Sequence, residues 1–167
     1  IFALAHSMGA AVVIRACHDG SPWFERIVLS APMIALPPGR LTHVAGPLTR
    51  LMRLMGIGGA YVPTGDAAAT GTESFIGNVL TSDPVRYARN AAVLEQEPEL
   101  GLGARTVAWP DVALRQMKQF ADPAYAASIR QPILMVAAGR DEVVSTPAIE
   151  TFGQNLLAGR HLILAGA

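Results

Sequence analysis

The sequence has a single cysteine, no excess of either charge, and no apolar run long enough to span a membrane. Because Cys17 stands alone, an internal disulfide framework and a cluster of thiolate ligands are excluded, and a reducing compartment is favoured. Thirteen basic and thirteen acidic residues cancel, which removes the electrostatic basis for binding nucleic acid. The longest nearly uncharged apolar stretch covers residues 1–14, whereas a transmembrane helix needs about 20 such residues.

Apolar residues make up 51% of the 167 residues and charged residues 16%. This balance is typical of one globular domain, or of one domain that carries an insertion. No basic segment followed by an apolar run and a small-residue cleavage site indicates a signal peptide, so we expect a cytoplasmic protein. The chain starts inside a strand-like run at Ile1 and stops just after another at Ala167, so we expect a fragment whose core continues on both sides.

Apolar periodicity predicts alternating strands and helices at both ends of the chain. One helix, from residue 8 to residue 18, joins the first two predicted strands, and another, from residue 146 to about residue 157, joins the last two. Elements that alternate in this way define an α/β domain with a largely parallel, doubly wound sheet, of which this chain holds a part. The strands are predicted at residues 1–6, 26–31, 132–138 and 161–166.

Residues 37–125 interrupt this alternation between the core segments 1–36 and 126–167. They are rich in glycine and proline, lack strand-like runs, and contain helix starts such as Asp83 followed by Pro84. We therefore expect a helical cap inserted over the site. Its apolar residues are candidates for lining an acyl-chain channel, and the alternative is that they pack the cap onto the core. These residues are Leu48, Leu51, Met52, Leu54 and Met55.

Ser7 lies between the first strand and the first helix, in the stretch AHSMGAA. A serine in a G-x-S-x-G setting at such a junction is a nucleophile elbow, whose strained backbone needs small neighbours. Here Ala5 replaces the first glycine, and Gly9 supplies the second. The following helix directs its N-terminus at the serine, and the backbone N–H of Met8 is the expected oxyanion donor. The alternative is an ordinary turn with an incidental serine.

An acid that completes a triad with Ser7 should follow a later strand, since the chain order in this arrangement is Ser, then Asp or Glu, then His. Asp141 comes directly after the predicted strand 132–138 and is the expected acid. Its alternative role is to stabilise the turn. The other candidates lie near predicted helix starts, where capping is the expected role. They are Asp83, Asp111 and Asp122.

No histidine of the chain fits as the base. His6 is adjacent to Ser7 but should point to the opposite face of the strand, and His18 lies at the far end of the helix that begins at the serine. His43 falls in the insertion, and His161 stands at the start of the last predicted strand, at the opposite edge of the sheet from Ser7. We therefore expect the base just beyond Ala167. Neither the histidines nor the carboxylates have metal-ligand spacing, so no metal or other cofactor is expected.

The segments HSMGAA, IVLSAPM, PILMVAAGRDEVVS and HLILAGA together resemble the carboxyl-terminal half of an α/β-hydrolase. The insertion stretch LTSDPVRYARNAAVLEQEPELGLG is similar to the cap of bacterial lysophospholipases, in the monoacylglycerol lipase and lysophospholipase-like group of serine hydrolases. The resemblance implies Ser7 as nucleophile, Asp141 as triad acid and Met8 as oxyanion donor. It also implies a triad histidine after the last strand and a second oxyanion donor in the first half of the fold, and no residue here corresponds to either.

The expected activity is hydrolysis of a lipid-type carboxylic ester, such as a monoacylglycerol or a lysophospholipid, through an acyl-enzyme. Acyl transfer and the hydrolysis of amides, peptides or small esters are alternatives on the same fold. A non-catalytic fragment is the third alternative, because the triad histidine is absent. We expect a small lipid-like ester as the binding partner and no nucleic acid. The cap is a candidate for peripheral contact with a membrane surface.

Overall fold

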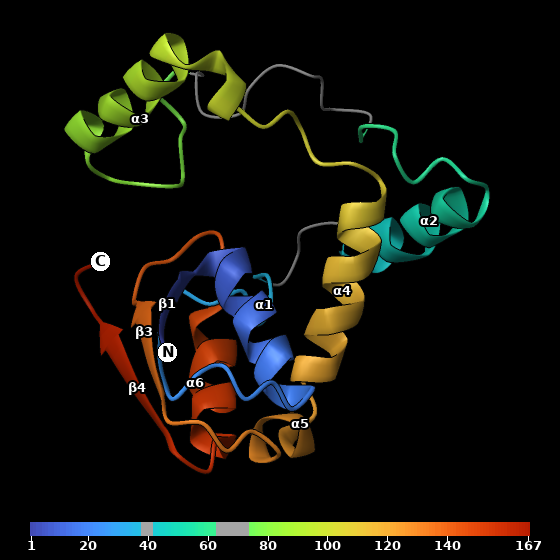
Figure 1. The fold of residues 1–167 in the computed structure, drawn as a ribbon. Coiled ribbons are helices and arrows are strands. Elements are labelled where there is room, and N and C mark those ends of the chain that lie inside the picture. The colour runs from blue at the N-terminus through green and yellow to red at the C-terminus, as the bar shows by residue number, and fades with distance from the viewer. Residues whose placement is uncertain (38–41, 63–73) are drawn as a thin grey trace. The chain divides into compact units, whose positions relative to one another are not determined.

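The computed structural model of the protein describes residues 1–37, 42–62 and 74–167 (Figure 1). The chain forms two compact units. Ile1–Arg40 together with Arg115–Ala167 form the first, here called the core unit, and Leu41–Leu114 form the second, here called the insertion unit. Residues 115–125, predicted as part of the insertion, belong to the compact core unit. The assignment of the insertion as a cap stays a prediction.

A four-stranded, fully parallel sheet organises the core unit, with strand order β1-β2-β3-β4. The strands are β1 Phe2–His6, β2 Arg26–Ser30, β3 Ile133–Ala138 and β4 Gly159–Leu164. Each lies within two residues of its predicted position. The predicted α/β class with a parallel sheet is therefore confirmed, and the carboxyl ends of all four strands meet at one edge.

Two helices cross over between these strands, α1 Ser7–His18 and α6 Thr146–Asn155, and both lie on the same face of the sheet (Figure 1). This follows from the strand order, because right-handed crossovers that all step in one direction place their helices on one side. The short helix α5 Pro123–Ala127 packs against α6. The core lies between sheet and helices. Its fully buried members include Ile14, Ile27, Leu29, Met135 and Ile149.

The opposite face of the sheet is not covered by the helices of the core unit. Strand side chains alternate between faces, and the residues that point away from α1 and α6 are exposed although many are apolar. Leu4, for example, is 80% exposed, whereas Leu29, on the covered face of the neighbouring strand, is fully buried. The exposed apolar set is Phe2, Leu4, Val28, Leu134, Leu162 and Leu164.

This difference between the two faces predicts unequal effects of two matched substitutions in the 167-residue chain. Leu29→Ala should lower the free energy of unfolding by about 2–5 kcal/mol, because it leaves a cavity in a packed core. Leu4→Ala should change it by less than about 0.5 kcal/mol, because the side chain is already in water. Urea denaturation of both variants measures the difference, and similar losses at the two positions would contradict the one-sided cover.

The described part of the insertion unit is helical, with α2 Thr42–Leu54, α3 Pro84–Gln96, the short 3₁₀ helix η1 Pro98–Leu100 and the first half of α4 Ala108–Phe120. The carboxylate of Asp83 accepts hydrogen bonds from the backbone N–H groups of Val85 and Arg86, which confirms the predicted N-cap of α3.

Asp111 plays a different part from the cap expected for it. It lies inside the first turn of α4 and is only 3% exposed. Its Oδ2 is 2.6 Å from Nε of Arg53, so an ion pair joins α2 to α4 within the insertion unit. A buried carboxylate needs such a partner, because burying an unpaired charge is costly. Asp122, by contrast, caps α5 by accepting from the N–H of Ala124.

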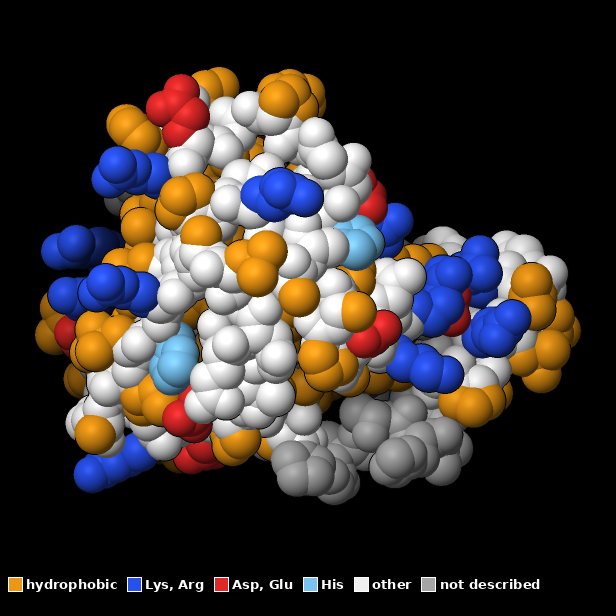
Figure 2. Space-filling view, turned by 90° about the horizontal axis from the view of Figure 1, so that it is seen from below, with side chains coloured by type: hydrophobic (Ala, Val, Ile, Leu, Met, Phe, Trp, Pro, Cys, Tyr) orange, Lys and Arg blue, Asp and Glu red, His pale blue; other side chains and the backbone are white. Residues whose placement is uncertain are grey.

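Charged side chains of both signs lie on the face seen in Figure 2, with apolar side chains between them. This agrees with the equal numbers of basic and acidic residues in the sequence. Among the helices of the described residues, none has both the length and the apolar character needed to cross a bilayer.

Candidate active site

Ser7 stands at the junction of β1 and α1, at the carboxyl edge of the sheet. Its φ is +48°, while His6 before it is extended with φ −123°. A positive φ is uncommon for a residue other than glycine and places strain in the backbone. The strained conformation predicted for Ser7 is therefore confirmed. The serine side chain is half-buried, and α1 begins directly at it.

The small neighbours of Ser7 differ in what surrounds them. Ala5 lies beside Leu29 of β2 and points toward the covered face. A Cβ added at Gly9 would meet no heavy atom within 4 Å among the described residues, so a steric need for glycine there stays a prediction. Met8, the second residue of α1, is 48% exposed. Its role as oxyanion donor also stays a prediction.

His6 shares the uncovered face of β1 with Leu4, as strand alternation predicts. Its side chain is exposed, and its Nδ1 lies 3.4 Å from Oγ of Ser30 on β2. The imidazole is thus directed to the neighbouring strand of the uncovered face, while α1 continues from Ser7 on the covered one.

Asp141 lies in the loop that leaves the carboxyl end of β3. Its Oδ1 accepts hydrogen bonds from the backbone N–H groups of Val143, at 2.8 Å, and Val144, at 2.9 Å. The turn-stabilising role considered for Asp141 is therefore present. Its Oδ2 makes no hydrogen bond or ion pair with any residue that the structure describes. A carboxylate can thus hold the turn with one oxygen and present the other to an imidazole.

The Asp141 loop is held tightly against the end of β4. The N–H of Gly139 donates to the carbonyl oxygen of Leu164 at 2.9 Å, and the N–H of Arg140 donates to that of Ala167 at 2.8 Å. A Cβ at Gly139 would lie 2.9 Å from Cα of Ala165, so only glycine allows this approach. The residues that follow β4 therefore run alongside the loop that carries Asp141.

Strand order brings these segments to one edge of the sheet. β2 separates β1 from β3, and neighbouring strands lie about 4.8 Å apart, so Ser7 and Asp141 are separated by roughly 10 Å along this edge. An imidazole with a hydrogen bond on each ring nitrogen bridges a serine and a carboxylate in triads of this kind. The end of β4, next to the Asp141 loop, lies at the same edge.

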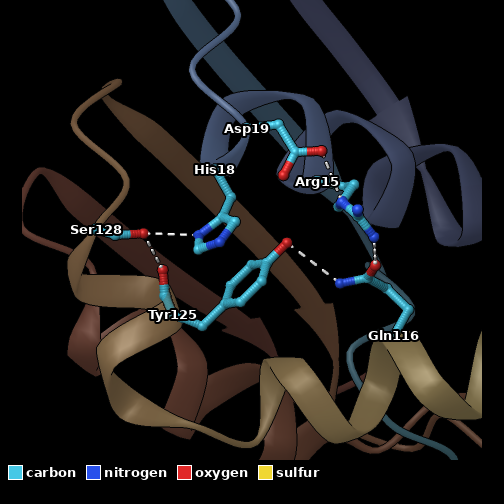
Figure 3. Close-up of polar contacts among 6 residues, drawn as sticks. All are labelled: Arg15, His18, Asp19, Gln116, Tyr125 and Ser128. Carbon is cyan, nitrogen blue, oxygen red and sulfur yellow. Dashed lines mark hydrogen bonds and ion pairs between the residues drawn. The ribbon is translucent and has the colours of Figure 1, made fainter.

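His18 lies at the opposite end of α1 from Ser7, as predicted, and is engaged there (Figure 3). Its ring stacks on Tyr125 with centroids 3.6 Å apart, and its Nδ1 lies 2.8 Å from Oγ of Ser128. The Ser128 hydroxyl donates to the carbonyl oxygen of Tyr125. Its oxygen therefore accepts from His18, and the pair is not a nucleophile activated by a base.

The same cluster ties the end of α4 to α1. Nη1 of Arg15 donates to Oε1 of Gln116 at 2.7 Å, and Nε2 of Gln116 donates to the Tyr125 hydroxyl at 3.2 Å (Figure 3). Nε of Arg15 also pairs with Asp19, which raises the pKa of the guanidinium. Burial raises the pKa of the Tyr125 phenol. The two hydrogen bonds of Gln116 thus join α4, where the chain returns from the insertion unit, to α1 and to Tyr125.

His161, the remaining histidine of the core unit, does not reach this edge either. His161 is the third residue of β4, whereas the predicted strand began at it. Its ring contacts α6, with Nε2 4.0 Å from Oε1 of Glu150. It lies three residues, or about 10 Å, short of the strand's carboxyl end. His43 belongs to α2, and its side chain lies outside the described residues.

No group of three or more His, Cys, Asp or Glu side chains among the described residues is placed to hold a metal ion. Cys17 is buried, with 4% of its surface exposed, and burial raises the pKa of its thiol. A buried thiol of raised pKa is a poor nucleophile.

Solved structures place this chain in the α/β-hydrolase fold class. It superposes on the monoacylglycerol lipase of Paleococcus ferrophilus with a TM-score of 0.68 at 17% identity, covering 97% of this chain and 56% of that one. A monoglyceride lipase variant of Saccharomyces cerevisiae gives 0.63 at 15%, covering 97% and 51%. A carboxyl esterase of Bacillus coagulans gives 0.67 at 15%, covering 97% and 54%. The chain thus spans a little over half the length of these enzymes.

The sequence of residues 1–163 matches the hydrolase family described as "Serine aminopeptidase, S33". The chain belongs to this family, and the predicted α/β-hydrolase resemblance is confirmed. No curated protein sequence matches it significantly.

Proposed function

We propose that the protein to which this chain belongs is a serine hydrolase that cleaves lipid-type carboxylic esters, such as monoacylglycerols or lysophospholipids. Ser7 is the nucleophile, Asp141 the triad acid, and the Met8 N–H an oxyanion donor. A histidine that follows Ala167 is the base, and a second oxyanion donor comes from outside these residues. The insertion unit is a cap whose apolar side chains accept the acyl chain and contact a membrane surface.

The observation that carries this proposal is the backbone of Ser7. Its φ of +48° falls at a strand-to-helix junction on the carboxyl edge of a parallel sheet, where ligands bind in open α/β sheets. Strained residues persist only where the surrounding structure holds them in place, and they are found most often at active sites. Asp141, two strands away on the same edge, supplies the acid that a serine nucleophile needs.

In the proposed reaction the histidine accepts the Ser7 hydroxyl proton as Oγ attacks the ester carbonyl. The carbonyl oxygen becomes an oxyanion held by backbone N–H donors. The C–O bond then breaks, and the alcohol leaves with the proton from the histidine. A water molecule, deprotonated by the same histidine, attacks the acyl-enzyme and releases the carboxylic acid and free Ser7. Asp141 stabilises the imidazolium at each step.

The apolar side chains of α2 support an acyl substrate. Leu48, Leu51 and Leu54, together with Met55 directly after the helix, are between 54% and 69% exposed. Apolar side chains left in water on one helix are typical of a surface that meets a ligand, a partner or a membrane. The similar solved structures include monoacylglycerol and monoglyceride lipases and a carboxyl esterase, one with a substrate analogue and one with glycerol.

A second candidate is hydrolysis of amides or peptides, which the family description favours by its words "serine aminopeptidase". The same nucleophile, acid and base serve both reactions. Esters and aminoacyl anilides therefore separate the two candidates better than any residue of the site does.

The test uses the protein extended by its natural flanking residues, with a fluorophosphonate probe and a substrate panel. We expect a covalent adduct on Ser7, detected on the tryptic peptide that ends at Arg15. We also expect faster turnover of monoacylglycerols or lysophospholipids than of aminoacyl anilides. An adduct elsewhere would contradict Ser7 as nucleophile. Preference for the anilides would support the amide or peptide candidate instead.

A further inference from the structure

Two residues other than glycine have positive φ in the described part of the chain, and they are neighbours. Ser7 has φ +48° and Ala31 has φ +41°. The register of β1 and β2 pairs His6 with Ser30, so the residues that follow these two emerge side by side at the carboxyl edge. A nucleophile elbow explains the positive φ of Ser7, but it does not explain the positive φ of Ala31.

The turn that Ala31 begins is anchored on both sides. The N–H of Ala31 donates to the carbonyl oxygen of Val136 on β3 at 2.7 Å. Pro32 is fully buried and Met33 is 7% exposed, so the turn is packed into the core unit. The N–H of Met33 then donates to the carbonyl oxygen of Ser7 at 3.1 Å. Through this last bond, the turn after β2 holds the elbow.

The bond from Met33 fixes more than one atom. The carbonyl of Ser7 and the N–H of Met8 belong to the same planar, trans peptide unit and point in opposite directions. A donor that holds the carbonyl therefore sets the direction of the Met8 N–H as well. Oxyanion donors act because they are oriented before charge develops, so this orientation contributes to the rate of the chemical step.

We propose that Ala31 is a positioning residue whose left-handed backbone brings the Met33 N–H to the Ser7 carbonyl and so aims the Met8 N–H at the oxyanion. The proposal rests on the proposed function, in which Ser7 is the nucleophile. It requires a residue at position 31 that tolerates positive φ. Glycine tolerates it freely, alanine at some cost, and a β-branched residue is a severe outlier there.

The experiment compares Ala31→Gly with Ala31→Val in the protein extended by its flanking residues. Ala31→Val should lower kcat about 10- to 100-fold with little change in KM, because misplacing a catalytic group by about 1 Å can cost about 100-fold in rate. It should weaken binding of a trifluoromethyl ketone substrate analogue, which forms the tetrahedral oxyanion, by a similar factor. Ala31→Gly should keep kcat within about threefold.

A second measurement removes the Met33 N–H donor and keeps every side chain. Residue 33 is replaced by the α-hydroxy acid of methionine, which turns its N–H into an ester oxygen and keeps the side chain, with methionine inserted by the same route as control. We expect kcat to fall about 10-fold or more, and the melting temperature to identify any unfolding. This variant decides the matter if Ala31→Val fails to fold, because it leaves the Ala31 backbone unchanged.

The positioning role would be overturned if the ester variant at residue 33 kept full kcat. It would also be overturned if Ala31→Val lost apparent substrate affinity as much as it lost kcat. Such a result leaves the proposed function standing, provided that Ser7→Ala is inactive. Conversely, an active Ser7→Ala would overturn the proposed function itself. The two failures are therefore distinguishable within one set of variants.

Discussion

Ser7→Ala is expected to lower ester turnover by about 10⁶-fold, because loss of the nucleophile in a Ser-His-Asp triad removes the covalent route altogether. The variant should still bind substrate, since the hydroxyl contributes little to ground-state affinity. The measurement is kcat on a monoacylglycerol in the protein extended by its flanking residues, together with loss of the fluorophosphonate adduct. Turnover that persists at more than about one part in a hundred would contradict Ser7 as nucleophile.

The matched control is Ser30→Ala. Ser30 is also a serine at the carboxyl end of a parallel strand, half-buried, in register with the residue before Ser7. It ends β2 and opens no helix. Its substitution should leave turnover within about threefold, so a large loss at Ser7 alone separates the nucleophile from a general effect on this edge of the sheet. The melting temperature of Ser7→Ala, compared with that of the unmodified protein, shows whether the substitution also changes stability.

Much of the fold could be predicted because its elements are specified locally. Each strand of the core is a short apolar run, and the helix α6 has a clear start signal. Ser145, for example, caps α6 just before Thr146 and Pro147. Right-handed crossovers then leave little choice of topology. The strain at Ser7 was predictable as well, because the residues around it match the pattern of a nucleophile elbow, whose backbone is strained.

Features that depend on long-range contacts were not predictable. Asp111 stands where a cap residue would stand, yet Arg53, distant in sequence, determines its role. Helix α5 has only five residues, too few for a periodic pattern, although Asp122 and Pro123 marked its start. The positive φ of Ala31 lies in a turn that bonds to Val136 and to Ser7, both distant in sequence. No pattern within the sequence SAPM indicates it, since none of these residues favours positive φ.

Asp141 shows how one residue can serve structure and chemistry at once, and a pair of substitutions separates the two. Asp141→Asn keeps an Oδ1 that can accept from Val143 and Val144, so the turn and the melting temperature should be preserved. The variant loses the negative charge that orients and stabilises the imidazolium. We expect kcat to fall about 10⁴-fold, the loss that an Asp-to-Asn change produces in a serine protease triad.

Asp141→Ala removes both functions and provides the comparison. It should lower kcat by a similar factor and also destabilise the loop by about 1–3 kcal/mol, because two backbone N–H groups lose their acceptor. Thermal melting and kcat of the two variants, measured side by side, separate the roles. If Asp141→Asn retained high turnover while Asp141→Ala lost it together with stability, Asp141 would be a turn residue only. In that case the triad acid must come from another segment.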